Sequence, residues 1–413
     1  MRVALLVFIG VLLGTAAPLR ADAGDELAIS LLTFGPGDHP FSKFGHQALL
    51  VEDHERGTRL VYNYGTFSFT SVWLVPKFLL GKYRYWLSVQ PLERTIDAYA
   101  AENRSMVVQR LRLTAQQKRN VADFLSWNAR DENKYYVFDY YRDNCATRLR
   151  DLIDRASGGA LARVSSAPAE MTWREHTQRL TANHPPVYAA LYVAMGDVID
   201  RPITVWEEMF LPAKVEETAR RATTESPLGP VPLVETEAVL LSDRRAPAPA
   251  RAPHWTGFAL LIGATCASLF VGLGWAASRG QRLARLALGL GVAALGSILG
   301  TSGALFVFLW AFTNHEVAHH NENILQCAPF ALLLGWSGLR LSMGRAGGAS
   351  RTVVIALAAL ASSALGLLLK ILPWFDQDNW QVIALLAPLW AGIALASLLA
   401  GHVFARAGSY ENG

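Results

Sequence analysis

The C-terminal part of the chain contains five long apolar spans, and they constrain the fold more than any other feature. The spans cover residues 255–277, 286–312, 324–342, 353–372 and 380–404. Each is close to the about 20 residues that an α-helix needs to cross a bilayer. We therefore expect residues 255–404 to form an all-α polytopic membrane domain of about five transmembrane helices. Residues 405–413 would be a short cytoplasmic tail.

Residues 1–23 have the features of a secretory signal peptide. Arg2 precedes an apolar run from Val3 to Leu13, and small residues end at Ala21-Asp22-Ala23. This order of a basic, an apolar and a small-residue region is typical of a cleavable signal. An uncleaved signal anchor is the alternative, and it would leave the rest of the topology unchanged.

The short loops between the apolar spans differ in charge. One side of the predicted membrane carries Arg279, Arg282, Arg285, Arg340, Arg345, Arg351 and Arg406. The other side carries Lys370 alone, with Glu316, Glu322, Asp376 and Asp378. Because positive loops stay inside, the arginine side is predicted to be cytoplasmic. Residues 24–254 then lie outside, in agreement with the signal peptide. These arginines account for much of the pI near 9.0, and no motif predicts a nucleic-acid partner.

Residues 24–225 are predicted to form an exported α+β domain. Strand candidates are residues 27–34, 46–53 and 59–67; helix candidates are residues 114–128, 186–196, 203–220 and a helix that begins at Cys145. Asn144 is a good N-cap for that last helix. Residues 226–254 are rich in Pro and Ala, which predicts a linker to the membrane domain.

Nine aromatic residues lie between positions 62 and 86. They are Tyr62, Tyr64, Phe67, Phe69, Trp73, Phe78, Tyr83, Tyr85 and Trp86. About half are expected to pack in the core of the sheet. The alternative for the others is an apolar groove, close to the membrane, that admits an acyl chain.

The exported part contains one cysteine, Cys145, whereas Cys266 and Cys327 lie in or beside membrane spans. A thiol at a helix N-terminus has a lowered pKa, because the helix dipole favours the thiolate nucleophile. His46, which follows Gly45 at the start of a strand, could act as its base. This is a papain-like pair in permuted order. The alternatives are a buried core thiol and a structural histidine.

Three stretches carry a resemblance to a known family. "LLTFGPGDHPFSKFGHQALLVED" (residues 31–53), "VYNYGTF" (61–67) and "DYYRDNCATRLRDLID" (139–154) resemble the exported domain of the Lnb-type thiol acyltransferases, which act in bacterial lipoprotein N-acylation. The resemblance implies a permuted papain-like fold with Cys145 as nucleophile and His46 as base. Asn63 and Tyr64 are candidates for a third, orienting residue.

The resemblance also implies the substrates and the location. A membrane phospholipid or a lipoprotein glyceryl ester would donate the acyl chain, and the N-terminal amine of a lipoprotein would accept it. No metal or other cofactor is expected. The enzyme would lie in the bacterial cytoplasmic (inner) membrane, with its catalytic domain on the periplasmic side. The residue pair alone leaves open a peptidase or amidase that acts on cell wall or lipid, and a non-enzymatic sensor or scaffold.

The loop "TNHEVAHHNENILQCAPF" (residues 313–330) also echoes the family. The family has a histidine followed by an N-x-N element here, matched by His315, Asn321 and Asn323. These residues are expected to help to hold a headgroup or the acceptor amine. "HEVAH" (residues 315–319) also fits the H-E-x-x-H signature of zinc proteases, so a zinc-dependent membrane protease is a further alternative.

Overall fold

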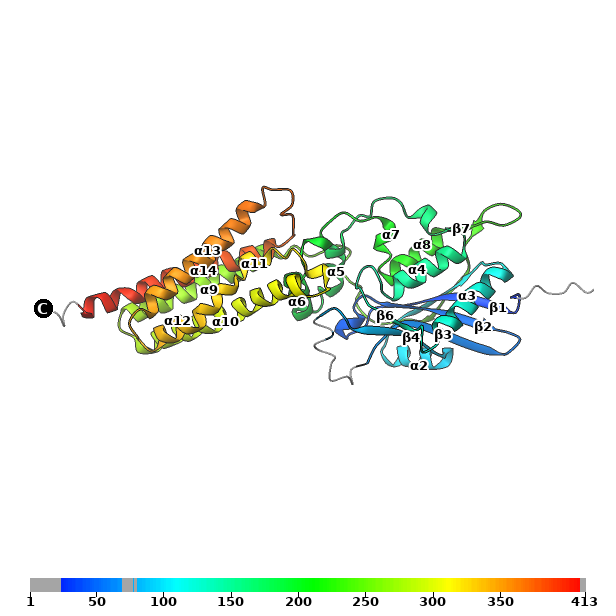
Figure 1. Cartoon of the computed structure of the whole chain (residues 1–413). Coiled ribbons are helices and arrows are strands. Elements are labelled where there is room, and N and C mark those ends of the chain that lie inside the picture. Colours follow the sequence, from blue (N-terminus) through cyan, green and yellow to red (C-terminus); the bar gives the residue numbers. More distant parts are fainter. Residues whose placement is uncertain (1–23, 69–76, 78–79, 409–413) are drawn as a thin grey trace, which may run out of the picture.

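A computed structural model describes residues 24–68, 77 and 80–408. The described chain forms an α+β domain, followed by an elongated bundle of helices that extends from one end of it (Figure 1). This confirms the predicted fold class. The predicted signal peptide, residues 1–23, lies outside the described residues, as do residues 409–413.

The α+β domain is built on a seven-stranded antiparallel sheet. Its strands are β1 Leu27–Phe34, β2 His46–Asp53, β3 Thr58–Thr66, β4 Arg84–Pro91, β5 Met106–Leu111, β6 Tyr135–Val137 and β9 Val234–Leu241. Their order is β6-β4-β3-β2-β1-β5-β9. The register pairs Phe34 at the end of β1 with His46 at the start of β2. A separate two-stranded sheet joins β7 Thr223–Thr224 to β8 Val231–Pro232.

Helices cover both faces of the large sheet, because apolar side chains alternate along its central strands. One face, with Leu31 and Leu49, packs against α3 Ala115–Asn128, α4 Cys145–Ala156 and α8 Pro212–Arg221. The other face, with Leu32 and Leu50, packs against α2 Leu92–Ala101. The shorter helices of the domain are η1 Pro40–Ser42, η2 Ala162–Val164, α5 Trp173–Thr181, α6 Pro185–Ala194, η3 Asp197–Ile199 and α7 Val205–Glu208.

The end of the α+β domain differs from the sequence prediction. Strand β9 lies within residues 226–254, which were predicted to be a linker, and it pairs with β5 at the edge of the sheet. Most residues of β9 are exposed. An edge strand with both faces in solvent shows no apolar alternation, so its sequence resembles that of a loop. The segment between the sheet and the first membrane helix is therefore shorter than predicted.

The helical part contains five spans long and apolar enough to cross a membrane. They are α9 Thr256–Ser278, α10 Arg282–Phe312, α11 Asn323–Gln326 with η5 Pro329–Leu332 and α12 Leu333–Ser342, α13 Gly348–Leu369, and α14 Trp380–Gly408. The third span is broken near Pro329, which cannot donate a helical hydrogen bond. Gly303 on α10 allows this close approach, because a Cβ there would lie 1.6 Å from the carbonyl oxygen of Cys327.

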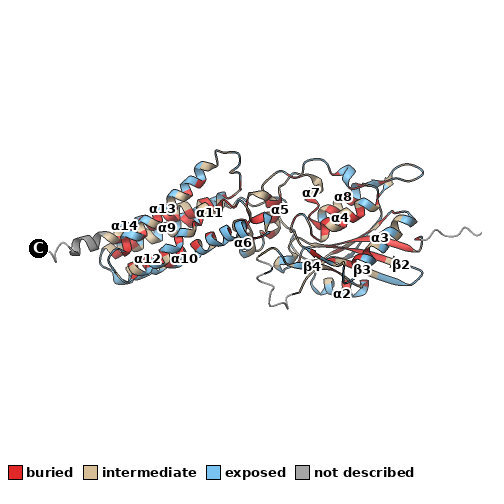
Figure 2. Cartoon of the chain, in the orientation of Figure 1, coloured by how far each residue is buried: buried red, intermediate tan, exposed pale blue. Residues whose placement is uncertain are grey.

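The outer surface of the bundle is exposed and apolar. Leu261, Leu269 and Ile298 are each more than half exposed. Figure 2 shows exposed, pale-blue segments along the helices of the bundle. Exposed apolar area on this scale is typical of a lipid-facing surface. The connections α9–α10 and α12–α13, which carry the arginines, lie at the end of the bundle remote from the α+β domain (Figure 1).

Helix α6 joins the two parts of the molecule. Tyr188 and Tyr192 on one face of α6 belong to the apolar core of the membrane bundle, and Tyr188 packs against Trp255 with ring centroids 4.6 Å apart. The backbone N–H of Gly196 donates to the carbonyl of Val317 at 2.8 Å. A Cβ at Gly196 would lie 1.8 Å from the carbonyl oxygen of His319. The α+β domain is therefore seated directly on the outer loops of the bundle.

Candidate active site

Cys145 is the first residue of α4. The Asn144 side chain accepts a hydrogen bond from the backbone N–H of Thr147 at 2.9 Å, and the Thr147 hydroxyl accepts one from the backbone N–H of Asn144 at 2.8 Å. This capping box fixes the start of the helix. The predicted role of Asn144 as N-cap is thus observed. Its amide nitrogen also donates to the carbonyls of Tyr140 and Phe210, so the side chain ties three segments together.

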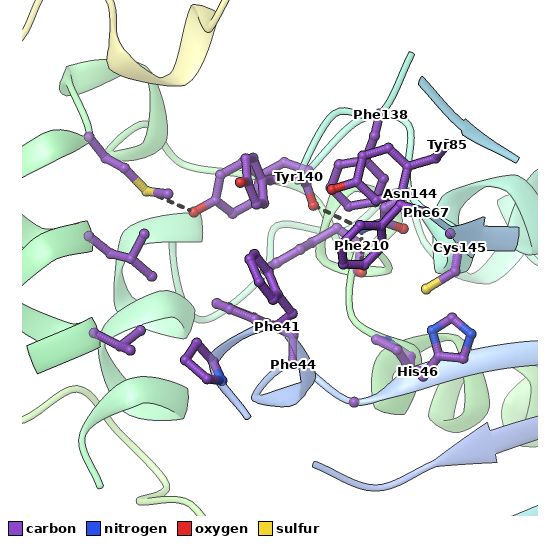
Figure 3. A pocket seen from close by; sticks show the side chains of 18 residues that line it. Phe41, Phe44, His46, Phe67, Tyr85, Phe138, Tyr140, Asn144, Cys145 and Phe210 are labelled. Atoms are coloured by element: carbon purple, nitrogen blue, oxygen red, sulfur yellow. Dashed lines mark hydrogen bonds between the residues drawn. The ribbon is translucent and has the colours of Figure 1, made fainter. Parts of the chain in front are cut away.

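His46 lies beside Cys145 and is held by Asn63 on the neighbouring strand. Nε2 of His46 is 2.5 Å from Oδ1 of Asn63. The thiol of Cys145 is hydrogen-bonded to the same imidazole ring, and Figure 3 shows its sulfur directed towards that ring. Because Nε2 is occupied by Asn63, Nδ1 is the nitrogen available to the thiol. The structure thus brings together His46, Cys145 and Asn63, and the other candidate from β3, Tyr64, points elsewhere.

Tyr64 projects to the opposite face of the sheet from Asn63, as the alternation of a strand requires. Its hydroxyl donates to Oδ1 of Asn128 on α3. Tyr64 is buried in the core with Leu149 of α4. Its position is structural, and it does not contact His46.

The environment favours charge on both Cys145 and His46. Burial by itself would lower the pKa of His46, but the Cys145 thiolate and the hydrogen bond to Asn63 outweigh it and raise that pKa above the usual 6.5. Burial would likewise raise the pKa of Cys145. The imidazolium of His46 and the backbone N–H groups of Gln47 and Ala146 reverse this and lower the pKa below the usual 9.0. The pair can therefore exist as thiolate and imidazolium.

Gly65 leaves a small space in front of this pair. A Cβ at Gly65 would lie 3.6 Å from Cε1 of His46, 3.8 Å from Cβ of Cys145 and 4.0 Å from the hydroxyl oxygen of Tyr136. Tyr136 comes from β6 and is buried, and its hydroxyl has no hydrogen-bond partner among the described residues. A buried hydroxyl without a partner is costly. Its position beside the thiol marks it as a hydrogen-bond donor for a reacting group.

An apolar chamber opens from Cys145 and His46. It has a volume of about 210 Å³. Most of its lining is aromatic or aliphatic, and includes Phe41, Phe44, Phe67, Tyr85, Phe138, Tyr140, Tyr141, Val187, Leu191, Met195 and Phe210. Figure 3 shows several of these rings around the cavity. Val187 and Leu191 belong to α6, so the far wall of the chamber is the helix that docks on the membrane bundle. Of the nine clustered aromatics, Phe67 and Tyr85 line the chamber, and Phe69, Trp73 and Phe78 lie outside the described residues.

A second, polar chamber meets His46 from another side. It is larger, about 880 Å³, and shares Phe41, Gly45, His46, Gly65 and Phe67 with the apolar chamber. Its remaining lining is mostly polar or charged, and includes Asp38, Asn63, Thr66, Tyr99, Glu102, Asn103, Arg104 and Arg245. The reacting pair therefore lies between an apolar and a polar space.

The candidates from the membrane loop are not at this site. Asn321 and Asn323 are buried, and their amide nitrogens donate to the carbonyl of Val193 at 2.9 and 3.0 Å. Asn321 also donates to the carbonyl of Ala194. These bonds cap the C-terminal end of α6, so the two asparagines dock the α+β domain. They do not line the chamber beside Cys145, contrary to the role expected for them in holding a substrate.

The "HEVAH" stretch does not have the geometry of a zinc-protease motif. Residues Glu316–Ala318 form a short 3₁₀ helix, with His315 and His319 as its flanking residues. The two histidines therefore do not lie on successive turns of an α-helix, as the motif requires. Glu316 forms an ion pair with Arg142, and Nε2 of His319 lies 3.2 Å from the carbonyl oxygen of Thr313. The stretch contacts the loop that precedes Cys145.

The sequence alone does not predict four residues at the site, namely Tyr136, Phe44, Leu191 and Arg104. Phe44 and Tyr136 have partial signals, because Phe44 is inside the motif around His46 and Tyr136 precedes the motif around Cys145 by only a few residues. Leu191 and Arg104 have no local signal. They reach the site through the docking of α6 and through the pairing of β5 with β1.

Comparison with known proteins agrees with the motifs. Searches of curated proteins and of solved structures gave no match. One family model, described as the Lnb N-terminal periplasmic domain, matches residues 15–179. The matched segment contains His46, Asn63, Tyr136 and Cys145. Residues 15–179 are therefore similar to the Lnb N-terminal periplasmic domain, and among the described residues they are followed by a helical region with five candidate membrane spans.

Proposed function

We propose that the protein is a membrane-bound thiol acyltransferase that moves a fatty acyl chain, through a thioester on Cys145, to the N-terminal amine of bacterial lipoproteins. The observation that carries this proposal is the apolar chamber that ends at the Cys145–His46 pair. A chamber lined by aromatic and aliphatic side chains favours an acyl chain over a peptide or a sugar. Its far wall, α6, rests on the membrane bundle, where acyl lipids are available.

In the first step the Cys145 thiolate attacks the carbonyl carbon of an acyl ester. A C–S bond forms, and the carbonyl oxygen becomes an oxyanion that the Tyr136 hydroxyl and the backbone N–H of Ala146 stabilise. The C–O bond to the alcohol then breaks. His46, which is protonated in the ion pair, gives its proton to the departing alkoxide. The products are an acyl-thioester on Cys145, a neutral imidazole and a lyso lipid.

In the second step the α-amine of the lipoprotein attacks the thioester. A C–N bond forms, His46 takes the proton of the amine, and the C–S bond breaks to release the Cys145 thiolate. The thiolate–imidazolium pair is thereby restored. An amide is more stable than a thioester, so the step runs downhill. Asn63 keeps the imidazole oriented through both steps by its hydrogen bond to Nε2.

The proposed location is the bacterial cytoplasmic membrane, with the α+β domain on the periplasmic side. The charge of the loops supports this orientation, because the arginines lie at the end of the bundle remote from the α+β domain. The membrane bundle would hold the site at the height of the outer leaflet. It would turn an encounter between two dilute membrane substrates into a positioned attack.

The proposal is tested by mass spectrometry of lipoprotein N-termini in bacterial cells that lack their own N-acyltransferase. These cells would express the wild type, Cys145→Ala, His46→Ala or the matched control Cys266→Ala, which removes a thiol remote from the site. The expected result is N-acylated termini with the wild type and with Cys266→Ala, and free termini with the other two variants. Free termini with a membrane-inserted wild type whose Cys145 can still be alkylated would overturn acyl transfer to lipoproteins and favour a hydrolase.

A further inference from the structure

The polar chamber on the other side of His46 is lined mainly by polar and charged side chains. It is about four times as large as the apolar chamber by volume, and Asn63, Thr66 and the end of α2 contribute to its wall. Any second substrate must approach the thioester within reach of His46. When the acyl chain fills the apolar chamber, the polar chamber, which borders His46 and Gly65, offers a route to the same carbonyl carbon.

Arg104 is the least satisfied group in this chamber. Its side chain is only 6% exposed. Nε donates to the carbonyl of Gly35 at 2.8 Å, and Nη1 lies 3.3 Å from Oε2 of Glu102. The guanidinium stacks on Tyr99, 4.6 Å from the ring centroid. Nη2 has no hydrogen-bond partner among the described residues. Leaving a buried guanidinium N–H without an acceptor is costly, so a ligand that supplies an acceptor here is favoured.

The charges around Arg104 indicate what kind of acceptor fits. Arg245 pairs with Asp38, and Arg104 pairs with Glu102, so the two arginines are matched by two carboxylates. A site for a lipid phosphate would keep an excess of positive charge and several free donors. Among the described residues, this chamber instead offers the unpartnered Nη2 of Arg104 in balanced surroundings, which suits the neutral carbonyl of a polypeptide. Its carboxylates also suit an incoming protonated amine.

We propose that the polar chamber binds the first residues of the acceptor polypeptide, and that Nη2 of Arg104 donates to one of its backbone carbonyls. This inference rests on the proposed acyl transfer and assigns to it the site of the second substrate. Arg104 is a substrate-binding residue of the aminolysis step. It has no contact with the acyl chain and no role in forming the thioester.

The test separates the two steps in full-length protein in proteoliposomes. Cys145 is first loaded with p-nitrophenyl palmitate, an acyl donor without phosphate or peptide, and the burst of p-nitrophenol measures thioester formation. The thioester is then treated with a synthetic diacylglycerylcysteinyl peptide that has a free α-amine, or with hydroxylamine, which is too small to need the chamber. Mass spectrometry follows the loss of the acyl group from Cys145.

Two pairs of variants are compared. Arg104→Gln is expected to slow aminolysis by the peptide about 10-fold, because one charged hydrogen bond is lost. The burst of p-nitrophenol and the cleavage by hydroxylamine should be unchanged. Arg104→Lys should restore part of the rate of aminolysis. Ala101→Trp places a large ring in the chamber from the exposed end of α2 and should slow peptide aminolysis on the order of 100-fold. Ala98→Trp, exposed on the same helix but outside the chamber, should have no effect.

Three other outcomes would overturn this inference or the acyl transfer on which it rests. Unchanged peptide aminolysis in both Arg104→Gln and Ala101→Trp overturns the inference. If Arg104→Gln slows loading from phosphatidylethanolamine vesicles and leaves peptide aminolysis unchanged, the chamber binds a lipid headgroup, and the inference is also overturned. A wild type that shows no burst removes the proposed thioester chemistry itself, and this inference with it.

Discussion

Asn63 on β3 and His46 on β2 form a hydrogen bond of 2.5 Å between Oδ1 and Nε2. The two strands are direct neighbours in the sheet, and the regular pairing of β3 with β4 is interrupted just after Asn63. Such an irregularity in a strand changes the direction of the side chains beside an active site. The orientation of the imidazole is therefore set by the sheet, and the thiol meets the ring from the start of α4.

Asn63→Ala should lower kcat by roughly 10- to 100-fold, because a hydrogen bond to a charged group contributes about 1.5–3 kcal/mol. Asn63→Asp keeps an acceptor at Nε2 and should retain more activity than Asn63→Ala. Steady-state transfer of palmitate to a lipopeptide measures both. Circular dichroism shows whether the sheet is intact. Equal rates for Asn63→Ala and the wild type would exclude an orienting role.

The reactivity of Cys145 should depend on pH through both members of the pair. The pKa of the thiol is lowered, so the rise of iodoacetamide alkylation with pH should have its midpoint below the usual thiol pKa of 9.0. In His46→Ala only burial and the backbone donors act, so the midpoint should shift to higher pH. Peptide-level mass spectrometry isolates Cys145 from Cys266 and Cys327. The same midpoint in both proteins would mean that the imidazole does not stabilise the thiolate.

The acyl-transfer rate should have an upper pH limit as well. The pKa of His46 is raised above 6.5, so the imidazolium that protonates the departing alkoxide survives to higher pH than a free histidine would. The rate of thioester formation from an ester should therefore fall only as the pH rises through this raised value. A fall whose midpoint lies below pH 6.5 would contradict the shift.

Tyr136→Phe should slow thioester formation about 100- to 1,000-fold, the usual cost of one lost oxyanion donor. Because the hydroxyl has no hydrogen-bond partner among the residues that the structure describes, its removal should leave the melting temperature unchanged or raise it slightly. Iodoacetamide alkylation of Cys145 forms no oxyanion and should be unaffected. A loss of alkylation in parallel with the loss of transfer would instead indicate a general disturbance of the site.

Leu191→Trp should shorten the acyl chain that the enzyme prefers. In the wild type each further methylene that enters the chamber should raise kcat/KM about fourfold, since burial of a CH₂ contributes about 0.8 kcal/mol. With a larger side chain on the far wall, this rise should stop at a shorter chain. Ala190→Trp, exposed on the same helix, is the matched control. The same chain-length profile in both variants would place the acyl chain outside this chamber.

Much of the fold could be predicted because its signals are local. The range of β1 and the start of α4 at Cys145 follow from apolar patterning and from the Asn144 cap. The helix at residues 114–128 has the expected capping box between Thr114 and Gln117. The five apolar spans follow from composition. In each case the residues whose pattern predicts the helix or strand lie within that helix or strand.

The features that were not predicted depend on contacts between distant segments. Strand β9 is held by pairing with β5, and its own sequence lacks a strand pattern. Asn321 and Asn323 look like site residues in a polar motif, but the carbonyls that they bind are contributed by α6. Tyr136 stands out because its buried hydroxyl has no hydrogen-bond partner in the described part of the chain. None of these properties can be read from the residues alone.

The docking of α6 fixes the height of the Cys145–His46 site above the helical bundle. With Tyr188 and Tyr192 in the apolar core of the helical bundle and Leu191 in the wall of the chamber, α6 links the distance between the Cys145 thiol and the bilayer midplane to the position of the bundle. Ester carbonyls of lipids occupy a narrow layer of the membrane. Under the proposed acyl transfer, substrates would be sorted by depth, and a change in bilayer thickness would alter turnover without altering any residue of the site.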